Sequence, residues 1–170
     1  QTDFTGYLGL NVAPRHFRNP HSCQQLLDML KAAGLPPSRL CLEITEGALI
    51  DDPERTCDLL NELRSHGMSL ALDDFGTGYS SLGYLHRFPL LTLKIDRSFV
   101  APLTSPTANQ GSASAAVVRA VVALAGSLGL SVVAEGIETQ AQADALCALG
   151  CHLGQGFLFA KPGPLPASSA

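Results

Sequence analysis

Short apolar segments alternate with longer segments of helical periodicity along this chain. Five segments have the length and aliphatic content of buried strands, at 7–12, 39–44, 68–73, 90–96 and 130–135, and a weaker sixth lies at 151–159. Between them the periodicity predicts helices over 21–33, 53–66, 80–87, 113–129 and 139–149. A repeated order of strand and helix is typical of an α/β fold with a parallel sheet.

Two segments lie outside this alternation. Residues 101–114 are rich in glycine, serine and proline and lack an apolar period, which predicts a surface loop before the long helix at 113–129. The last residues, 163–170, have the composition of a tail. We therefore expect one domain over 1–162, followed by a short tail.

Polar side chains end five of the predicted strands, and all of them have the same parity within their strands. Because successive side chains of a strand point to opposite faces, these residues lie on the face opposite to the leucines and isoleucines. They are Asn11, Glu43, Asp73, Lys94, Asp96 and Glu135. A (β/α) barrel gathers its active-site groups at the carboxyl ends of successive parallel strands, whereas an open doubly wound sheet gathers them at one crevice. The pattern therefore predicts a TIM-type (β/α) barrel.

The predicted barrel is incomplete. Six strands are visible where a closed barrel has eight, and 170 residues fall short of the ~200–250 that such a fold typically needs. The chain also begins without Met and enters a strand almost at once. We expect about six of eight β-α units, with two missing most simply at the N-terminal side. An open barrel has unpaired edges, so we expect these residues alone to be inactive and prone to aggregate.

The shared rim would collect five carboxylates, one amide and one lysine. Carboxylates this close raise one another's pKa, so either a divalent cation lies between them or some are protonated. Oxygen ligands without His or Cys favour Mg²⁺ or Mn²⁺ over zinc. The acids exceed what one ion needs, which favours a two-metal site of the kind that performs in-line displacement at phosphorus.

The adjacent acids Asp73 and Asp74, in "SLALDDFGTGYSSL" (69–82), raise a geometric question. On a regular strand they would face opposite ways, so both reach a metal only if the strand breaks, and we expect Gly76 and Gly78 to supply that break. A single strand-end acid is more often a helix cap, and Lys94 alone could be a surface lysine. The agreement of five strand ends favours the shared site.

Composition narrows the function further. The net charge is −4 and the Lys and Arg residues are scattered, so duplex nucleic acid is not an expected partner. Five cysteines without a CxxC pair predict buried, reduced thiols and a cytoplasmic protein. The five histidines show no ligand spacing and are interpreted as surface or core-edge residues. We expect no apolar run to approach the ~20 residues that span a bilayer, and no signal peptide is visible.

Six motifs then resemble, in order and spacing, those of the EAL-domain family of cyclic di-GMP phosphodiesterases. They are "NVAPRHF" (11–17), "LEITE" (42–46), "ALDDFGTGYSSL" (71–82), "LKIDRSFV" (93–100), "VVAEGIET" (132–139) and "GQGFLFAKP" (154–162). The resemblance covers nearly the whole chain. It implies a TIM-type barrel that uses Mg²⁺ or Mn²⁺ to hydrolyse cyclic di-GMP to linear pGpG.

The resemblance also implies roles for single residues. Asn11, Glu43 and Asp73 look like ligands of one metal, Asp74 would bridge two ions, and Asp96 would hold the second. Lys94 would orient the attacking water or offset charge on the phosphate. Glu135 would act near the second metal as a water-mediated ligand or general base, with Glu138 and Gln155 in support. Glu46 looks like the residue that holds the "DFGTGYSS" loop and is implicated in dimer contacts.

One departure from the family is important. The signature Glu-Ala-Leu tripeptide, whose Glu is a metal ligand on an earlier strand, does not occur in these 170 residues, nor does the nearby Arg that usually contacts substrate. The main alternative is therefore a catalytically silent EAL domain that binds cyclic di-GMP or a protein partner. An unrelated barrel, such as an enolase-like lyase, shares a lysine and acids but not these motifs. The resemblance further implies a homodimer and fused N-terminal sensory or diguanylate-cyclase-like domains, with possible membrane tethering through them.

Overall fold

The structure, a computed structural model, describes residues 7–50, 52–77, 85–104 and 108–163. Within these ranges six strands form one parallel sheet whose spatial order is the order of the sequence. The strands are β1 (Leu8–Val12), β2 (Leu40–Thr45), β3 (Ser69–Phe75), β4 (Thr92–Ile95), β5 (Ser131–Ala134) and β6 (Leu153–Gly154). The predicted parallel α/β fold is confirmed.

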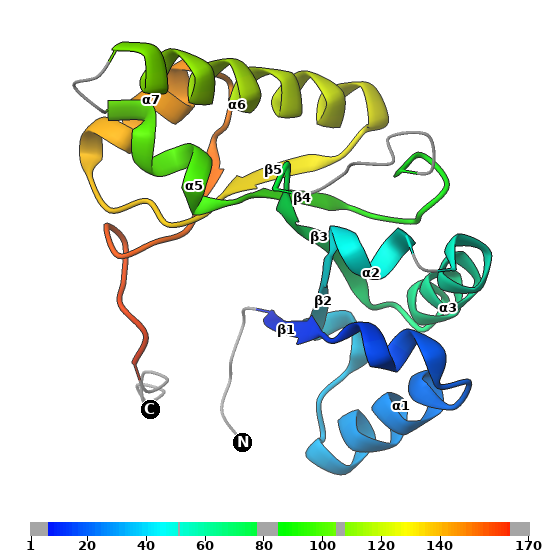
Figure 1. Cartoon of the computed structure of the whole chain (residues 1–170). Helices are drawn as coiled ribbons and strands as arrows, with labels where there is room; N and C mark the ends of the chain where they lie inside the picture. Colours follow the sequence, from blue (N-terminus) through cyan, green and yellow to red (C-terminus); the bar gives the residue numbers. More distant parts are fainter. Residues whose placement is uncertain (1–6, 51, 78–84, 105–107, 164–170) are drawn as a thin grey trace.

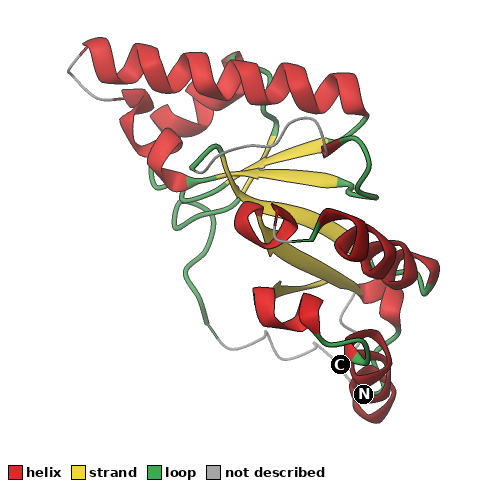
Figure 2. Cartoon of the chain, turned by 45° about the vertical axis from the view of Figure 1, so that its right-hand side comes forward, coloured by secondary structure: helices red, strands yellow, loops and turns green. Residues whose placement is uncertain are grey.

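Helices connect the strands and lie along one side of the curved sheet (Figures 1 and 2). The α-helices are α1 (Ser22–Ala33), α2 (Glu46–Ile50), α3 (Pro53–Ser65), α5 (Arg97–Val100), α6 (Ala108–Leu128) and α7 (Gln140–Ala148). Short 3-10 helices are η1 (Pro14–Arg18), η2 (Pro37–Arg39) and η3 (Ala101–Thr104). Figure 1 shows α1, α2 and α3 beside the first strands, and α5, α6 and α7 beside β4 and β5.

The core lies between this helical layer and the sheet. The aliphatic face predicted for the strands is buried, with side chains exposed by 1% or less at Leu42, Leu70, Leu72, Leu93 and Ile95. Leu8 and Leu10 have the same parity but are 49% and 42% exposed, because β1 pairs with β2 alone among the described strands. Burying the polar parity instead would cost several kcal/mol per charged group, so the alternation fixes which face packs against the helices.

Local signals explain where several helices begin. Asp52 accepts a hydrogen bond at Oδ1 from the Arg55 N–H at 3.2 Å, which caps α3, and Pro53 fits the first turn. Thr139 and Gln142 form a capping box at the start of α7. The helices predicted over 21–33, 53–66 and 139–149 are therefore found within about one residue at each end.

The loop predicted at 101–114 is wrong over its described part. Residues 101–104 form η3, and α6 begins at Ala108, five residues before the predicted start at 113. Residues 108–112 contain a single alanine, so local propensity does not explain the early start; extending an existing long helix adds one backbone hydrogen bond per residue. The strand predicted at 151–159 is limited to Leu153–Gly154. Most of the helix predicted at 80–87 lies outside the described residues.

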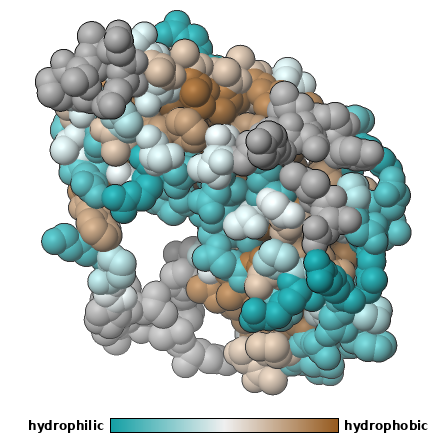
Figure 3. All heavy atoms as spheres, viewed as in Figure 1, coloured by the Kyte–Doolittle hydropathy of each residue, from teal (hydrophilic) through white to brown (hydrophobic). Residues whose placement is uncertain are grey.

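α6 also corrects the expectation that no segment reaches the length of a membrane span. By length and composition, Gly111–Leu128 is long and apolar enough to cross a bilayer, and 22% of it is buried in the molecule. Val118, Val121 and Ala125 are buried against the rest of the fold. Apolar surface is visible in the upper part of Figure 3, where α6 lies in the same view of Figure 1. One such helix is by itself weak evidence for a membrane span.

The cysteines follow the predicted burial with two exceptions. All five are free thiols, and Cys23, Cys41 and Cys151 are buried. Cys57 is half-buried, whereas Cys147 is exposed on α7. Burial of all five is therefore wrong, and their reduced state stays a prediction. Cys147 lies near the end of a short helix, in a segment that also contains buried apolar residues. The sequence pattern there does not distinguish an exposed position from a buried one.

Candidate metal centre

Five neighbouring parallel strands, β1 to β5, bring polar and charged side chains to one edge of the sheet. In the parallel register, Asn11 of β1 lies opposite Glu43 of β2, and Thr45 lies opposite Asp73 of β3. Lys94 comes from β4, and Glu135 directly follows β5. The predicted convergence at the carboxyl ends of the strands is therefore observed for these residues.

Lys94 is the cation of this edge and is only 5% exposed. Its Nζ lies 2.7 Å from Glu43 Oε2, 2.5 Å from Glu135 Oε1 and 3.6 Å from Asp73 Oδ1. Burial alone would lower the pKa of Lys94, but the hydrogen bonds to Glu135 and Glu43 outweigh it and raise the pKa above its ordinary value. The lysine therefore stays charged, and the surface interpretation of Lys94 is excluded.

Asp74 changes the direction of β3. Its φ is 55°, in the left-handed region, and the pairing of β3 with β4 shifts register between Leu72 and Phe75. The Asp74 N–H donates to Asp73 Oδ1 at 3.0 Å, and Thr77 Oγ1 donates to the Asp74 carbonyl at 2.8 Å. The expected break is present: Asp74 bends the chain inside the strand, and Gly76, whose φ is 95°, directly follows the end of β3, while Gly78 lies outside the described residues.

This bend places three carboxylates together in what we call the carboxylate centre, formed by Asp73, Asp74 and Glu135. One oxygen of each lies within 4.8 Å of the others. Burial raises the pKa of Asp74, and the charges of Asp73 and Asp96 raise it further, against the opposing effect of Lys94. Burial also raises the pKa of Glu135, although its hydrogen bond from Lys94 opposes this. A cation among these oxygens would relieve both costs.

The donor set of the carboxylate centre fits a hard divalent ion. All three ligating groups are carboxylates, which Mg²⁺, Mn²⁺ and Ca²⁺ prefer, and no thiol or imidazole joins them among the described residues. Two are half-buried and Asp73 is buried, so the ligands are held in place before an ion arrives. The residues present therefore fit the metal that the sequence predicts.

The remaining predicted ligands lie around this centre rather than in it. Asn11 is exposed on β1, beside Glu43, which is engaged by Lys94. Asp96 is the N-cap of α5 and accepts a hydrogen bond at Oδ1 from the Ser98 N–H at 3.0 Å. Burial would raise the pKa of Asp96, but the hydrogen bonds from Ser98 and the charge of Arg97 lower it. Asp96 is close enough to influence the pKa of Asp74 but lies outside the group of three.

A cavity of about 450 Å³ opens beside the centre. Its lining includes Asp96, Glu135, Glu138, Gln155, Phe157 and Lys161. Gln155 Nε2 donates to Glu135 Oε1 at 2.7 Å, so the predicted support of Glu135 by Gln155 is present. The Glu138 side chain is exposed, and its backbone N–H donates to Gln142 Oε1 at 2.8 Å.

Two cations of this cavity, Arg97 and Lys161, are not indicated by strand parity. The signal that the sequence offers is their place in two of the motifs. Arg97 lies in "LKIDRSFV" (93–100), and Lys161 lies in "GQGFLFAKP" (154–162). Gly156 also lines the cavity, and its backbone packs closely on Ile137. A Cβ at this position would lie 2.2 Å from the Ile137 carbonyl oxygen. The backbone therefore approaches too closely for any side chain at position 156.

Glu46, the first residue of α2, is buried with 7% exposure. Neither of its carboxylate oxygens has a hydrogen-bond partner among the described residues, which is unusual for a buried acid. The loop that it was predicted to hold includes 78–82, which lie outside the described residues. Its position directly after β2 nevertheless places it near the edge of the sheet that carries the carboxylate centre.

Comparisons with known proteins identify the family. The model of the EAL domain matches residues 2–162. The cyclic di-GMP phosphodiesterase RocR of Pseudomonas aeruginosa is 43% identical over 158 residues, which cover 92% of this chain and 39% of that protein. The bifunctional diguanylate cyclase/cyclic di-GMP phosphodiesterase MucR of Pseudomonas aeruginosa is 41% identical over 157 residues, which cover 92% of this chain and 22% of MucR.

Solved structures agree. The MucR phosphodiesterase in complex with c-di-GMP superposes with a TM-score of 0.85 and 40% identity, covering 94% of this chain and 62% of that one. Klebsiella pneumoniae BlrP1, solved with manganese and c-di-GMP, gives a TM-score of 0.79 and 37% identity, covering 92% of this chain and 39% of that one. BlrP1 has also been solved with calcium.

The chain belongs to the EAL-domain family. Its fold is therefore that of a TIM-type barrel, of which the described residues form six consecutive strands with their helices outside. The chain spans 19% to 22% of the length of the first four relatives and 39% of RocR.

Proposed function

We propose that this chain forms the catalytic part of a phosphodiesterase that hydrolyses cyclic di-GMP to linear pGpG with Mg²⁺ or Mn²⁺. The observation that carries the proposal is the carboxylate centre at the carboxyl ends of the strands, with Lys94 beside it and a cavity that opens next to Glu135. Support also comes from relatives that are named as cyclic di-GMP phosphodiesterases and from related structures that hold c-di-GMP with manganese.

We propose two ions, since the sequence predicts more oxygen ligands at this rim than one ion needs. The ligands would be Asn11, Glu43 and Asp73 for one ion, Asp74 between the two, and Asp96 for the second. When bound, such ions acidify water and neutralise charge on a phosphodiester. Asp96 would keep one oxygen on the Ser98 N–H and offer the other.

The protein's own groups would then direct the hydrolysis. Lys94 is a permanent buried cation and would orient the attacking water, while Glu135, fixed by Lys94 and Gln155, would accept a proton from it. The water oxygen forms a new bond to phosphorus, the bond from phosphorus to the 3′ oxygen breaks, and that oxygen takes up a proton. The product keeps a 5′ phosphate, which is linear pGpG. Arg97 and Lys161 give the cavity a positive side for the substrate's phosphates.

One observation favours the alternative function of a silent receptor. Lys94 already pairs with Glu43 and Glu135 in this structure, so part of the acidic charge is compensated without any metal. A receptor would bind cyclic di-GMP in the same cavity without cleaving it.

The decisive experiment incubates the protein that contains this chain with cyclic di-GMP and follows pGpG by chromatography. We expect turnover with Mg²⁺ or Mn²⁺, little with Ca²⁺, and a loss of more than about 100-fold in Asp74→Asn and Glu43→Gln, since even groups that only support metal ligands are worth 10–100-fold. Asp58→Asn, an exposed acid on α3, is the matched control and should keep full activity. Binding of cyclic di-GMP without any turnover supports the receptor instead, and full activity in both variants would refute the ligand assignment.

We propose the surroundings of the domain from the same relatives. MucR carries the name of a diguanylate cyclase as well as a phosphodiesterase, and all the relatives are longer than this chain. These facts support fused further domains, which we place on the N-terminal side. We further propose a homodimer and a cytoplasmic site of action. Light scattering of the full protein, with Glu46→Gln as a variant, tests the dimer.

A further inference from the structure

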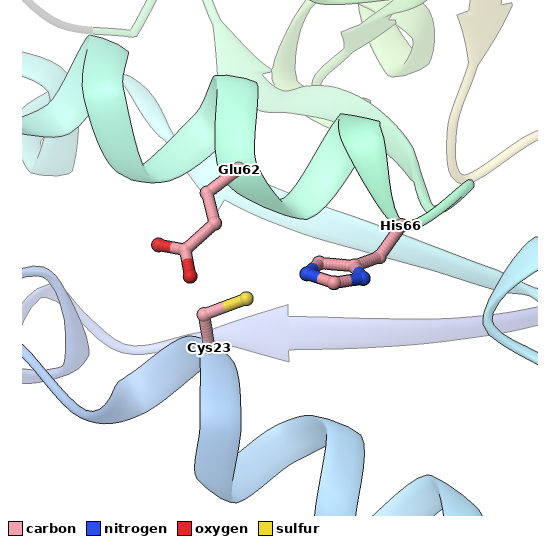
Figure 4. A group of neighbouring side chains, drawn as sticks. All are labelled: Cys23, Glu62 and His66. Atoms are coloured by element: carbon pink, nitrogen blue, oxygen red, sulfur yellow. The ribbon is translucent and has the colours of Figure 1, made fainter.

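A second group of ligand-type side chains lies on the outside of the barrel, between α1 and α3. Figure 4 shows Cys23, Glu62 and His66, which point toward one another across the contact of the two helices. One ligand atom of each lies within 4.8 Å of the others. We call these three residues the thiol cluster; they share no residue with the carboxylate centre and play no part in the proposed hydrolysis.

The secondary structure explains why the three meet. Glu62 and His66 are four residues apart at the end of α3, so they lie one turn apart on the same face. Cys23 is the second residue of α1, and α1 packs against α3. Ser22 Oγ donates to the His16 carbonyl at 2.6 Å, which ties down the start of α1. The cluster is therefore placed by a helix repeat and a helix–helix contact.

Burial divides the cluster into a fixed part and a movable part. Cys23 is 1% exposed, whereas Glu62 and His66 are exposed. The ligands of a tetrahedral zinc site lie about 3 to 4 Å apart, given zinc–ligand distances near 2.0–2.3 Å. The exposed side chains would need to move inward by about 1 Å, which free rotation allows, while the thiol stays in place.

We propose that the thiol cluster binds one Zn²⁺-type ion through Cys23 Sγ, a Glu62 oxygen and a His66 ring nitrogen. Sulfur, nitrogen and oxygen together suit zinc, and a thiol excludes the hard ions that fit the carboxylate centre. Water from the exposed side would complete four ligands. Binding exchanges the thiol proton for the metal and releases that proton to solvent, so no oxidant or reductant is needed.

Such an ion would join α1 to the end of α3. His66 is followed after two residues by β3, which carries Asp73 and Asp74. The ion would therefore stabilise the folded chain at the point where the polypeptide enters its functional strand. Because the ion binds the folded arrangement and not the unfolded chain, the melting temperature should rise with zinc concentration.

The test uses Co²⁺ as a spectroscopic substitute for zinc, added to reduced, metal-free protein with excess Mg²⁺ to occupy the carboxylate centre. We expect a thiolate-to-cobalt absorption band that saturates at one equivalent and disappears when Zn²⁺ is added. Cys23→Ser should abolish the band, and His66→Gln or Glu62→Gln should weaken binding at least about tenfold. Cys147→Ser and His152→Gln, which alter an exposed thiol and an exposed imidazole elsewhere, are the matched controls and should bind as the unmodified protein does.

Three results would overturn the proposal. They are the absence of a thiolate band, its persistence in Cys23→Ser, and full affinity in both His66→Gln and Glu62→Gln, which would mean adventitious binding to a thiol. Because Glu62 and His66 are exposed, their variants should melt at the same temperature as the unmodified protein without metal, so a loss of affinity cannot be ascribed to unfolding.

Discussion

The carboxylate centre and the thiol cluster each bring together three ligand-type side chains, but they are built in different ways. The carboxylate centre stands on strands, uses oxygen alone and has the buried cation Lys94 beside it. The thiol cluster stands on two outer helices and combines sulfur, oxygen and nitrogen, with two of its three side chains exposed. The first is fixed by backbone register, whereas the second depends on side chains that can rotate.

This difference teaches what each site can do. Fixed carboxylates that repel one another hold a place for a cation before it binds, which suits the positioning of a reacting phosphodiester. A cluster of mobile side chains around one buried thiol suits capture of an ion that stabilises the fold. Four variants or titrations test that contrast between a pre-organised site and an adjustable one, from the largest expected effect to the smallest.

Removing Lys94 should have the largest effect. Lys94→Met leaves Glu43, Glu135 and Asp73 together without their buried cation, which should cost about 3 kcal/mol of unfolding free energy in the absence of metal. Added Mn²⁺ should restore part of this loss. Urea unfolding in chelator and in Mn²⁺ measures both values, with Lys31→Met, an exposed lysine of α1, as the matched control. Equal stability of Lys94→Met and the unmodified protein in chelator would contradict the conclusion that these carboxylates need the charge of Lys94.

The backbone at Asp74 should produce the next largest effect. A β-branched residue at a φ of 55° is disfavoured by about 1 to 2 kcal/mol, whereas asparagine tolerates this region. Asp74→Val should therefore be less stable than Asp74→Asn by that amount, although both lose the ligand. Thermal unfolding of the two variants provides the comparison, and identical stabilities would show that position 74 does not need the left-handed conformation.

The acidity of Cys23 tests the thiol cluster without metal. Burial raises its pKa from 9.0 to about 11, and the charge of Glu62 and a hydrogen bond to Glu62 contribute. The folded pKa is above the unfolded value, so the stability that this thiol contributes is fully present below pH 9.0 and is lost as the pH rises through about 11. Nuclear magnetic resonance of ¹³C-labelled cysteine, with Cys23→Ser for assignment, measures the midpoint. A midpoint at the ordinary value of 9.0 would show that Cys23 is not in this environment.

Glu62→Gln should have the smallest effect on stability. Glu62 is exposed, so the free energy of unfolding without metal should change by less than about 0.5 kcal/mol. The pKa of Cys23 should fall toward 9.0, since the charge that helps to raise it is gone. Urea unfolding at neutral pH and the same resonance titration give the two values, and a large loss of stability would mean that Glu62 has a structural role without metal.

The contrast also explains which features could be predicted from the sequence. Strand parity repeats every two residues, so the sequence alone is enough to place Glu43, Asp73, Lys94 and Glu135 on one face. Asp74 reaches the same place, as expected, but besides the left-handed backbone of Gly76 the bend needs a left-handed φ at Asp74 itself, which the sequence did not indicate. Asp96 also has the parity of a ligand, yet one of its oxygens caps α5, a competing role that parity cannot reveal.

The thiol cluster escapes prediction for a different reason. Its members come from segments 39 residues apart, and contact between α1 and α3 depends on tertiary packing rather than on local spacing. The spacing of Glu62 and His66 is visible in the sequence. A search for ligand spacing among the histidines alone misses it, because the partner of His66 is a glutamate. The early start of α6 is hidden in a similar way, because the composition of 108–112 indicates a loop, whereas the helix that follows can extend into it.

The order of the strands has a consequence for how the chain is made. Each strand pairs with the strand that precedes it, so the sheet can grow one strand at a time as the ribosome releases the polypeptide from its N-terminal end. Asp73 and Asp74 emerge about sixty residues before Glu135, and therefore the carboxylate centre is assembled only after β5 has joined the sheet. Metal-dependent resistance to proteolysis should appear only in nascent chains that extend beyond Glu135. The ion would then bind after five strands of the sheet have formed, and it would not nucleate folding of the sheet.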